Sequence, residues 1–319
     1  MKIFSIPYLL IFLSVLVVNA QEKPTFKPYS VATTFKKLKK KYPFITPIKP
    51  ISSNKIICKE NVVYKKINRT KLKLDIYYPA ENKNACFPAV LLIHGGGWLT
   101  GSKENQQIMA QNLALHGYVA ITVSYRLGVE AKYPAAVNDI KDAIVWTKKK
   151  AKKYHINKDK IAILGASAGA QLATLVGVTP NNDVYTTHKK ISNKVQVIVN
   201  IDGVVSFIHP EAAAESKKGK ASMAGIWLNG EKEENYKNWK EASPLEYVGK
   251  NTPPILFVNS SYDRFHAGRD DMISILNQHK IYNQTYTIPK SPHSFWLVNP
   301  WFDKTLHYVV DFLSKVLKG

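Results

Sequence analysis

The sequence contains little cysteine and little arginine. Two of the 319 residues are Cys, and only four of the 45 Lys+Arg are Arg. Two cysteines exclude a small domain built around several disulfides. The small number of arginines argues against a nucleic-acid-binding protein, because such proteins use the guanidinium for bidentate contacts to bases and phosphates. We therefore expect no nucleic-acid partner, despite a formal net charge of +22.

Acidic side chains are also few, 23 in all. The resulting positive charge favours a polyanionic partner such as an acidic polysaccharide. A lysine bias accompanied by abundant Asn and Ile is equally expected from genome composition, so both interpretations stay open. If the charge is functional, the basic residues that could surround a substrate are Lys217, Lys218, Lys220, Arg264 and Lys290.

Long apolar runs are absent except at the N-terminus, where residues 3–18 follow Lys2. Val18-Asn19-Ala20 has the small-residue spacing of a signal-peptidase site. This pattern predicts a signal peptide over residues 1–20 and a secreted or periplasmic protein with no membrane insertion after cleavage. An uncleaved anchor is the alternative. In an oxidising compartment, Cys58 and Cys86 are expected to form one disulfide, and two free buried thiols are the other possibility.

A composition that is 45% hydrophobic and 21% charged is typical of a folded globular protein. Residues 21–53 are rich in Pro and Lys and are predicted to form a basic arm, whereas residues 54–319 are predicted to form one larger domain. Strands and helices alternate there, which predicts an α/β fold with a mostly parallel sheet and helices on both faces. Between the sixth and seventh strands, residues 203–252 are expected to form a helical insertion. The predicted strands are 56–64, 72–78, 89–93, 119–123, 161–164, 195–201, 254–259 and 285–288, and the closing helix is 301–317.

One motif points to nucleophilic catalysis. The strand 161–164 runs into Gly165-Ala166-Ser167-Ala168-Gly169, and a helix follows at once. A serine in a sharp strand-to-helix turn is exposed for attack, and glycines on both sides let other backbone approach. The sequence therefore predicts Ser167 as the nucleophile. The amide of Ala168, at the helix N-terminus, is predicted to stabilise an oxyanion.

A second glycine-rich loop, His94-Gly95-Gly96-Gly97-Trp98, follows the strand 89–93. Its backbone N–H groups can reach a reacting carbonyl oxygen without obstruction by side chains. Gly96 and Gly97 are predicted to complete the oxyanion hole with Ala168. His94 is expected to hold this loop in shape by a hydrogen bond and not to act as the base.

The base and the acid are expected after later strands, in the chain order Ser, acid, His. His293 lies between the last strand and the closing helix and is the predicted base. Asp263, just beyond the strand 254–259, is the preferred acid. Asp202, directly after the strand 195–201, is the alternative, because some serine hydrolases place the acid one strand earlier.

These motifs resemble those of the α/β-hydrolase superfamily, in particular the HGGG-type esterases. The resemblance extends from about residue 56 to the C-terminus and includes Ser124-Tyr125-Arg126 and Ala242-Ser243-Pro244-Leu245. The chain is most similar to exported bacterial esterases that remove acetyl or feruloyl groups from plant cell-wall polysaccharides. One departure is Ser260-Ser261-Tyr262, which lacks the glycine that usually opens the loop of the acid.

The resemblance implies acyl-enzyme chemistry without metal or cofactor. The expected function is a serine carboxylesterase acting on a polysaccharide or oligosaccharide ester such as acetylated pectin or xylan, possibly an acidic one. A small-ester carboxylesterase, an exported peptidase and a non-catalytic carbohydrate-binding relative are the alternatives. Four aromatic residues flank the catalytic loops and could stack on sugar rings: Trp98, Phe295, Trp296 and Trp301.

Overall fold

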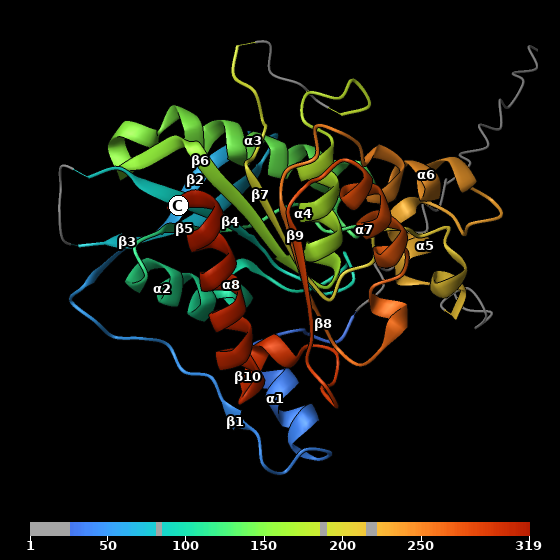
Figure 1. The fold of residues 1–319 in the computed structure, drawn as a ribbon, viewed down its shortest axis with the longest axis horizontal. Helices are drawn as coiled ribbons and strands as arrows, with labels where there is room; N and C mark the ends of the chain where they lie inside the picture. The colour runs from blue at the N-terminus through green and yellow to red at the C-terminus, as the bar shows by residue number, and fades with distance from the viewer. Residues whose placement is uncertain (1–25, 81–84, 186–189, 215–221) are drawn as a thin grey trace, which may run out of the picture.

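The central element of the structure, a computed structural model, is an eight-stranded sheet with the order β2-β3-β5-β4-β6-β7-β8-β9 (Figure 1). The residues described are 26–80, 85–185, 190–214 and 222–319. From β5 to β9 all neighbouring strands are parallel, whereas β2 and β3 join the edge antiparallel. The strands are β2 (Ile56–Ile67), β3 (Thr70–Pro79), β4 (Phe87–Ile93), β5 (Val119–Val123), β6 (Ile156–Ala166), β7 (Val197–Ile201), β8 (Ile255–Asn259) and β9 (Asn283–Thr287).

The predicted fold class is confirmed. All eight predicted strands are present, and the differences lie at their ends. β6 begins five residues earlier than the apolar pattern indicated, because Ile156 pairs with Phe87 before the register shifts. Polar residues fill that first part of β6, so hydrophobicity alone could not reveal it.

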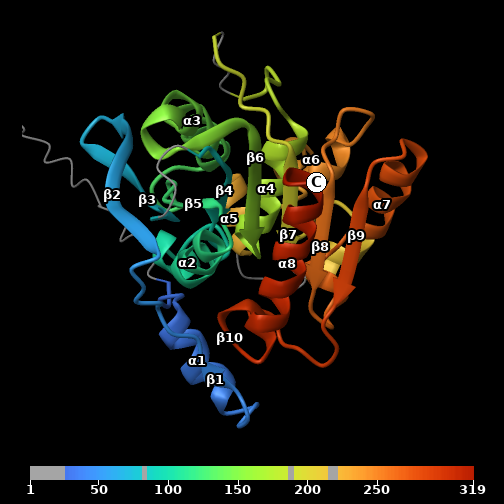
Figure 2. The same ribbon diagram turned by 60° about the vertical axis from the view of Figure 1, so that its left-hand side comes forward.

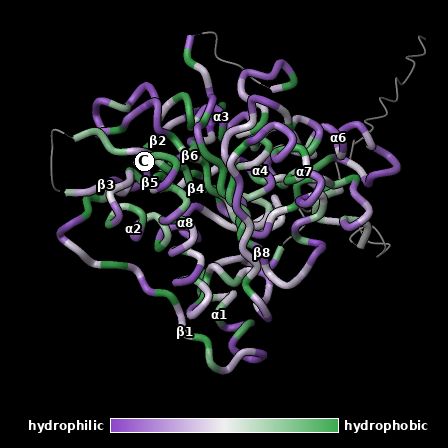
Figure 3. The backbone as a smooth tube through the Cα atoms, viewed as in Figure 1, coloured by the Kyte–Doolittle hydropathy of each residue, from purple (hydrophilic) through white to green (hydrophobic). Residues whose placement is uncertain are grey.

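Two hydrophobic cores, one on each face, hold the sheet between helices. In β4, Leu91 and Ile93 belong to one core, and Val90 and Leu92 to the other. Such alternation follows from the two-residue period of a strand. Figure 3 shows the hydrophobic residues concentrated in these central strands. The helices that line the first core are α3 (Ala135–Lys149), α4 (Ala168–Val178) and α7 (Arg269–Gln278), and those that line the second are α2 (Gln107–Leu115) and α8 (Trp301–Leu317).

The basic arm contains a helix, α1 (Val31–Lys39), which the lysine-rich composition did not indicate. Ser30 caps this helix, since its hydroxyl accepts from the amide of Thr33. A short strand, β1 (Thr46–Pro47), then pairs with β10 (Val298–Asn299). Figure 2 shows α1 and β1 extending beyond the main sheet beside β10.

The predicted signal peptide, residues 1–20, lies outside the described residues. Within the described part of the chain, no helix is long and apolar enough to cross a membrane. In the described part of residues 203–252, the expected insertion, two short α-helices lie between β7 and β8: α5 (Met223–Leu228) and α6 (Tyr236–Glu241).

The predicted disulfide is not present, because the sheet order separates the two cysteines. Cys58 in β2 is aligned through Tyr77 and Ala120 with Val90 in β4, so two strands lie between β2 and the strand that Cys86 precedes. Three strand spacings amount to roughly 14 Å, whereas a disulfide requires Cα atoms within about 7 Å. Both thiols are free and exposed.

We expect maleimide to label both thiols of the unreduced, folded protein. Although Cys58 is exposed as a residue, partial loss of hydration around its sulfur raises the pKa of the thiol to about 11. Because only the thiolate reacts, the labelling rate of Cys58 should rise about tenfold per pH unit between pH 8 and pH 10. Peptide mass spectrometry would follow each site separately. A peptide that joins Cys58 to Cys86 would contradict the sheet order described above.

Candidate active site

Ser167 lies in a strained turn between β6 and α4. Its backbone has φ 55° and ψ −126°, a conformation that is costly for a residue with a side chain. The flanking glycines make the turn possible. A Cβ at Gly165 would lie 2.0 Å from the Gly169 carbonyl oxygen, and a Cβ at Gly169 would lie 2.3 Å from the Ile93 carbonyl oxygen. The turn therefore exposes the Ser167 hydroxyl above the end of the sheet.

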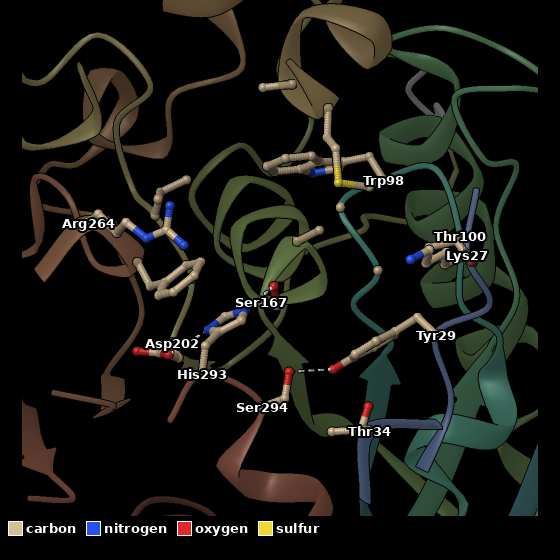
Figure 4. A pocket seen from close by; sticks show the side chains of 18 of the residues that line it. Lys27, Tyr29, Thr34, Trp98, Thr100, Ser167, Asp202, Arg264, His293 and Ser294 are labelled. Carbon is tan, nitrogen blue, oxygen red and sulfur yellow. Dashed lines mark hydrogen bonds and ion pairs between the residues drawn. The ribbon is translucent and has the colours of Figure 1, made fainter. Parts of the chain in front are cut away.

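A chain of hydrogen bonds connects Ser167 to a buried carboxylate. The Ser167 Oγ lies 2.8 Å from Nε2 of His293, and Nδ1 of His293 lies 2.7 Å from Oδ2 of Asp202. Figure 4 shows the imidazole between the hydroxyl and the carboxylate. The Asp202 side chain is fully buried, and its other oxygen accepts from the Ser260 amide at 2.8 Å. This arrangement fixes the His293 ring with Nδ1 as a donor and Nε2 directed at the serine.

The preferred acid, Asp263, is not part of this chain of hydrogen bonds, and the alternative, Asp202, takes its place. The Asp263 side chain is 90% exposed and faces His266 at 3.7 Å. Asp263 begins a 3-10 helix, Asp263–Phe265. This turn places the ring of Phe265, and not the carboxylate of Asp263, beside His293. Phe265 stacks on His293 with ring centroids 3.5 Å apart.

Adjacent strands explain why Asp202 reaches the base. β7 pairs directly with β6, and the Ser167 amide donates to the Ile201 carbonyl at 2.9 Å. Gly203 allows the following loop to pass close by, because a Cβ there would lie 2.7 Å from the Ser167 carbonyl oxygen. The position of Asp202 directly after the strand 195–201 was the sequence signal for this alternative acid.

The loop after β4 also depends on glycine. Gly96 has φ 124° and Gly97 has φ 58°, both in the region that favours glycine. A Cβ at Gly96 would lie 2.0 Å from the Thr100 carbonyl oxygen. Gly96, Gly97 and Ala168 line the same cavity as Ser167. Ala168 is the first residue of α4, where backbone amides lack an intrahelical acceptor.

His94 holds this loop, as predicted. The ring is buried, and its Nδ1 donates to the Gly95 carbonyl at 2.8 Å. It stacks on Tyr125, whose hydroxyl donates to the His94 carbonyl. Burial lowers the pKa of His94 to about 4, so the ring is neutral at pH 7.

Only one of the four predicted substrate-binding aromatics lines the cavity of about 900 Å³ at Ser167. That residue is Trp98, which is held by a stack on Trp227 and by a hydrogen bond from its Nε1 to Gln171. Phe295, Trp296 and Trp301 are buried and are not among the described residues that line it, so the expectation that they contact substrate is corrected. Trp296 instead packs edge-on against His293, with centroids 5.2 Å apart.

Several lining residues were missed. Phe265 lies two residues after Asp263, and Met223 and Trp239 belong to the insertion between β7 and β8. Lys27 and Tyr29 come from the arm, about 140 positions before Ser167. No motif or spacing marks them, because a contact between such distant segments depends on how the arm packs. Among the described residues, no group of His, Cys, Asp and Glu is arranged to hold a metal ion.

The sheet, the strained serine turn and the hydrogen-bonded Ser167, His293 and Asp202 define an α/β-hydrolase of the esterase superfamily. The BD-FAE family model matches residues 74–269, more than half of the chain. The chain therefore belongs to the BD-FAE family. Ser167 and Asp202 lie within the matched region, and His293 lies beyond it.

Several known proteins of similar sequence or structure are esterases. Esterase LipC of Mycobacterium tuberculosis (strain ATCC 25618 / H37Rv) is 25% identical over 60% of this chain and 48% of its own, so the chain spans about half the length of that relative. A truncated carbohydrate esterase from gut microbiota has a TM-score of 0.69 at 20% identity, over 85% of this chain and all of its own. A bifunctional GH43-CE protein of Bacteroides eggerthii has a TM-score of 0.68 at 24% identity, over 81% of this chain and 38% of its own.

We expect Asp202→Asn to reduce kcat for 4-nitrophenyl acetate by about 10⁴-fold. An amide at this position would hold the imidazole in the wrong tautomer while leaving its place unchanged. Asp263→Asn is the matched control and should stay within about twofold of the wild type, since its carboxylate is in solvent. A larger loss in the Asp263 variant than in the Asp202 variant would contradict this assignment.

Proposed function

We propose that this protein is a serine carboxylesterase that removes ester-linked acyl groups from carbohydrate. The observation that carries the proposal is the continuous hydrogen-bond chain from the Ser167 hydroxyl through His293 to buried Asp202, at the base of an open cavity. A non-catalytic relative would have no need to keep the strained turn at Ser167. The esterase relatives and the BD-FAE family membership support the same chemistry.

In the first half of the reaction, the Ser167 Oγ attacks the ester carbonyl carbon and its proton passes to Nε2 of His293. The imidazolium that forms is stabilised by Asp202, which accepts from Nδ1 at 2.7 Å. The negative charge on the carbonyl oxygen is stabilised by the amides of Gly96, Gly97 and Ala168. When the carbon–oxygen bond to the alcohol breaks, His293 returns the proton to the leaving alkoxide.

In the second half, a water molecule replaces the alcohol. His293 accepts a proton from the water, and the hydroxide attacks the carbonyl of the acyl-serine. Collapse of this intermediate releases the carboxylic acid and returns the proton to Ser167.

The preferred substrate within this proposal is an O-acetylated plant cell-wall polysaccharide, such as pectin or xylan. The enzyme would act on this substrate after its export from the cell. The neighbours described as carbohydrate esterases support a sugar as the alcohol. A cavity of about 900 Å³ has room for more than an acetyl group, and Trp98 on its wall can stack on a sugar ring.

Ser167→Ala should leave the fold intact and lower kcat for 4-nitrophenyl acetate by several orders of magnitude, because it removes the covalent route. The melting temperature, followed by circular dichroism, is the control for folding. A variant that kept more than a tenth of the wild-type kcat would exclude Ser167 as the nucleophile.

Acetate release from acetylated pectin and from acetylated xylan, together with ferulate release from methyl ferulate, would test the substrate. We expect acetate release from at least one polymer, and none with Ser167→Ala. Turnover of 4-nitrophenyl acetate without release from any polymer would reduce the function to that of a small-ester carboxylesterase.

A further inference from the structure

Tyr29 of the arm contacts the residue that follows the catalytic base. Its hydroxyl lies 3.1 Å from Oγ of Ser294, and His293 precedes Ser294 in the chain. Figure 4 shows the Tyr29 side chain at the cavity, directed at Ser294. Burial raises the pKa of the Tyr29 phenol, so the hydroxyl keeps its proton at neutral pH. A residue 265 positions earlier in the chain is thus hydrogen-bonded to the neighbour of the base.

The segment that carries His293 has a serine near each end. Before the base, the Ser291 hydroxyl donates to the Ile288 carbonyl at 2.8 Å and attaches the segment to the chain just past β9. After the base, Ser294 has φ 71°, which is uncommon for a residue with a side chain. Ser294 precedes the 3-10 helix Phe295–Leu297, yet its hydroxyl makes no cap hydrogen bond to that helix. The hydroxyl is directed at the arm instead, so the arm holds this side of the segment.

The backbone of Tyr29 is attached to a second catalytic loop. Its carbonyl accepts from the Asn105 side chain at 3.0 Å, and Asn105 is buried. Asn105 lies against the end of the glycine loop. A Cβ at Gly101 would lie 3.4 Å from Nδ2 of Asn105 and 2.3 Å from the Gly95 carbonyl oxygen. Tyr29 therefore joins the loop that supplies the oxyanion hole to the segment that carries the base.

The rest of the arm is held independently of the Tyr29 hydroxyl. The strand β1 pairs with β10 downstream of α1. Leu38 and Ile45 of the arm are buried in the second core, which also contains Phe295 and Trp296. Loss of this one hydroxyl should therefore leave the arm and the fold in place.

The basic side chains considered from the sequence as substrate contacts take no part in this arrangement. Arg264 lines the cavity, whereas Lys290 is not among its described lining residues. Residues 217–220 lie outside the described part of the chain. The contact between the arm and the base segment joins two uncharged hydroxyl groups, those of Tyr29 and Ser294.

We propose that Tyr29 is a positioning residue for His293, and that it acts through Ser294 to hold the imidazole where Nε2 takes the proton of Ser167. The stack on Phe265 limits tilting of the His293 ring. The contact of Tyr29 with Ser294 limits movement of the backbone from which that ring extends. Such placement matters, because a displacement of about 1 Å can cost about 10²-fold in rate. This inference rests on the proposed esterase function and adds a residue from outside the catalytic loops.

Tyr29→Phe removes the hydroxyl and keeps the ring. We expect kcat for 4-nitrophenyl acetate to fall about tenfold while KM stays within about twofold, because a displaced base weakens the transition state and not the binding of the ester. Ser294→Ala removes the same contact from the other side and should have the same effect. Since both changes break one contact, Tyr29→Phe/Ser294→Ala should lose no more activity than either single variant.

Tyr118→Phe is the matched control. The Tyr118 hydroxyl also lies 3.1 Å from a serine, Ser314 of α8, but Tyr118 precedes β5 at the end of the strand remote from the catalytic loops. Its kcat should stay within about twofold of the wild type. The melting temperature, followed by circular dichroism, shows whether each variant is folded, and Ser294→Ala tests the contact if Tyr29→Phe is not.

Four results would overturn the positioning role. These are an unchanged kcat in Tyr29→Phe and in Ser294→Ala, a raised KM at constant kcat, single losses that multiply in the double variant, and an equal loss in Tyr118→Phe. A raised KM alone would mean that the Tyr29 hydroxyl contacts the substrate and does not act on the base. The esterase function is judged separately, by Ser167-dependent turnover of 4-nitrophenyl acetate in the otherwise wild-type protein.

Discussion

The close approach of backbone around Ser167 is the constraint on which the rest of the site depends. At Gly165, Gly169 and Gly203, an added Cβ would lie within 2.7 Å of a neighbouring carbonyl oxygen. These positions bring the ends of β4, β6 and β7 together more tightly than side chains would allow. As a result, the glycine loop, the nucleophile and the acid meet at one point. The strain at Ser167 persists because the surrounding strands leave the turn no alternative.

The parallel sheet provides the rigidity that this point requires. Ile93 is aligned with Gly165, and Ala166 with Ile201, so the carboxyl ends of three adjacent strands lie level. Their aliphatic side chains are fully buried on both faces, and each such side chain contributes roughly 1.5–3 kcal/mol to folding. Loops that leave this edge therefore start from fixed positions, which is why short loops can hold hydrogen bonds of 2.7 and 2.8 Å.

The walls of the cavity come from several separate segments of the chain: the arm, the loops after the strands, and the insertion between β7 and β8. The region that matches the BD-FAE family, residues 74–269, contains the nucleophile, the acid and the glycine loop. The arm and the segment that carries His293 lie outside it, and they are attached to each other at Tyr29 and at β1. The cavity is thus built from both portions of the sequence: the matched region provides Ser167, Asp202 and Trp98, and the segments outside it provide His293 and Tyr29.

The sequence by itself determined the sheet, the nucleophile, the base and the glycine loop, because each depends on a local pattern: an apolar strand, a sharp turn or a run of glycines. Only the tertiary structure decided between Asp202 and Asp263, since the choice depends on which strand lies beside β6 and on where the loop after β8 turns. The same holds for Cys58 and Cys86, which two intervening strands keep apart, and for Tyr29 of the arm. Each of these outcomes depends on how segments far apart in the chain pack against one another. A local sequence pattern does not indicate which distant segments become neighbours.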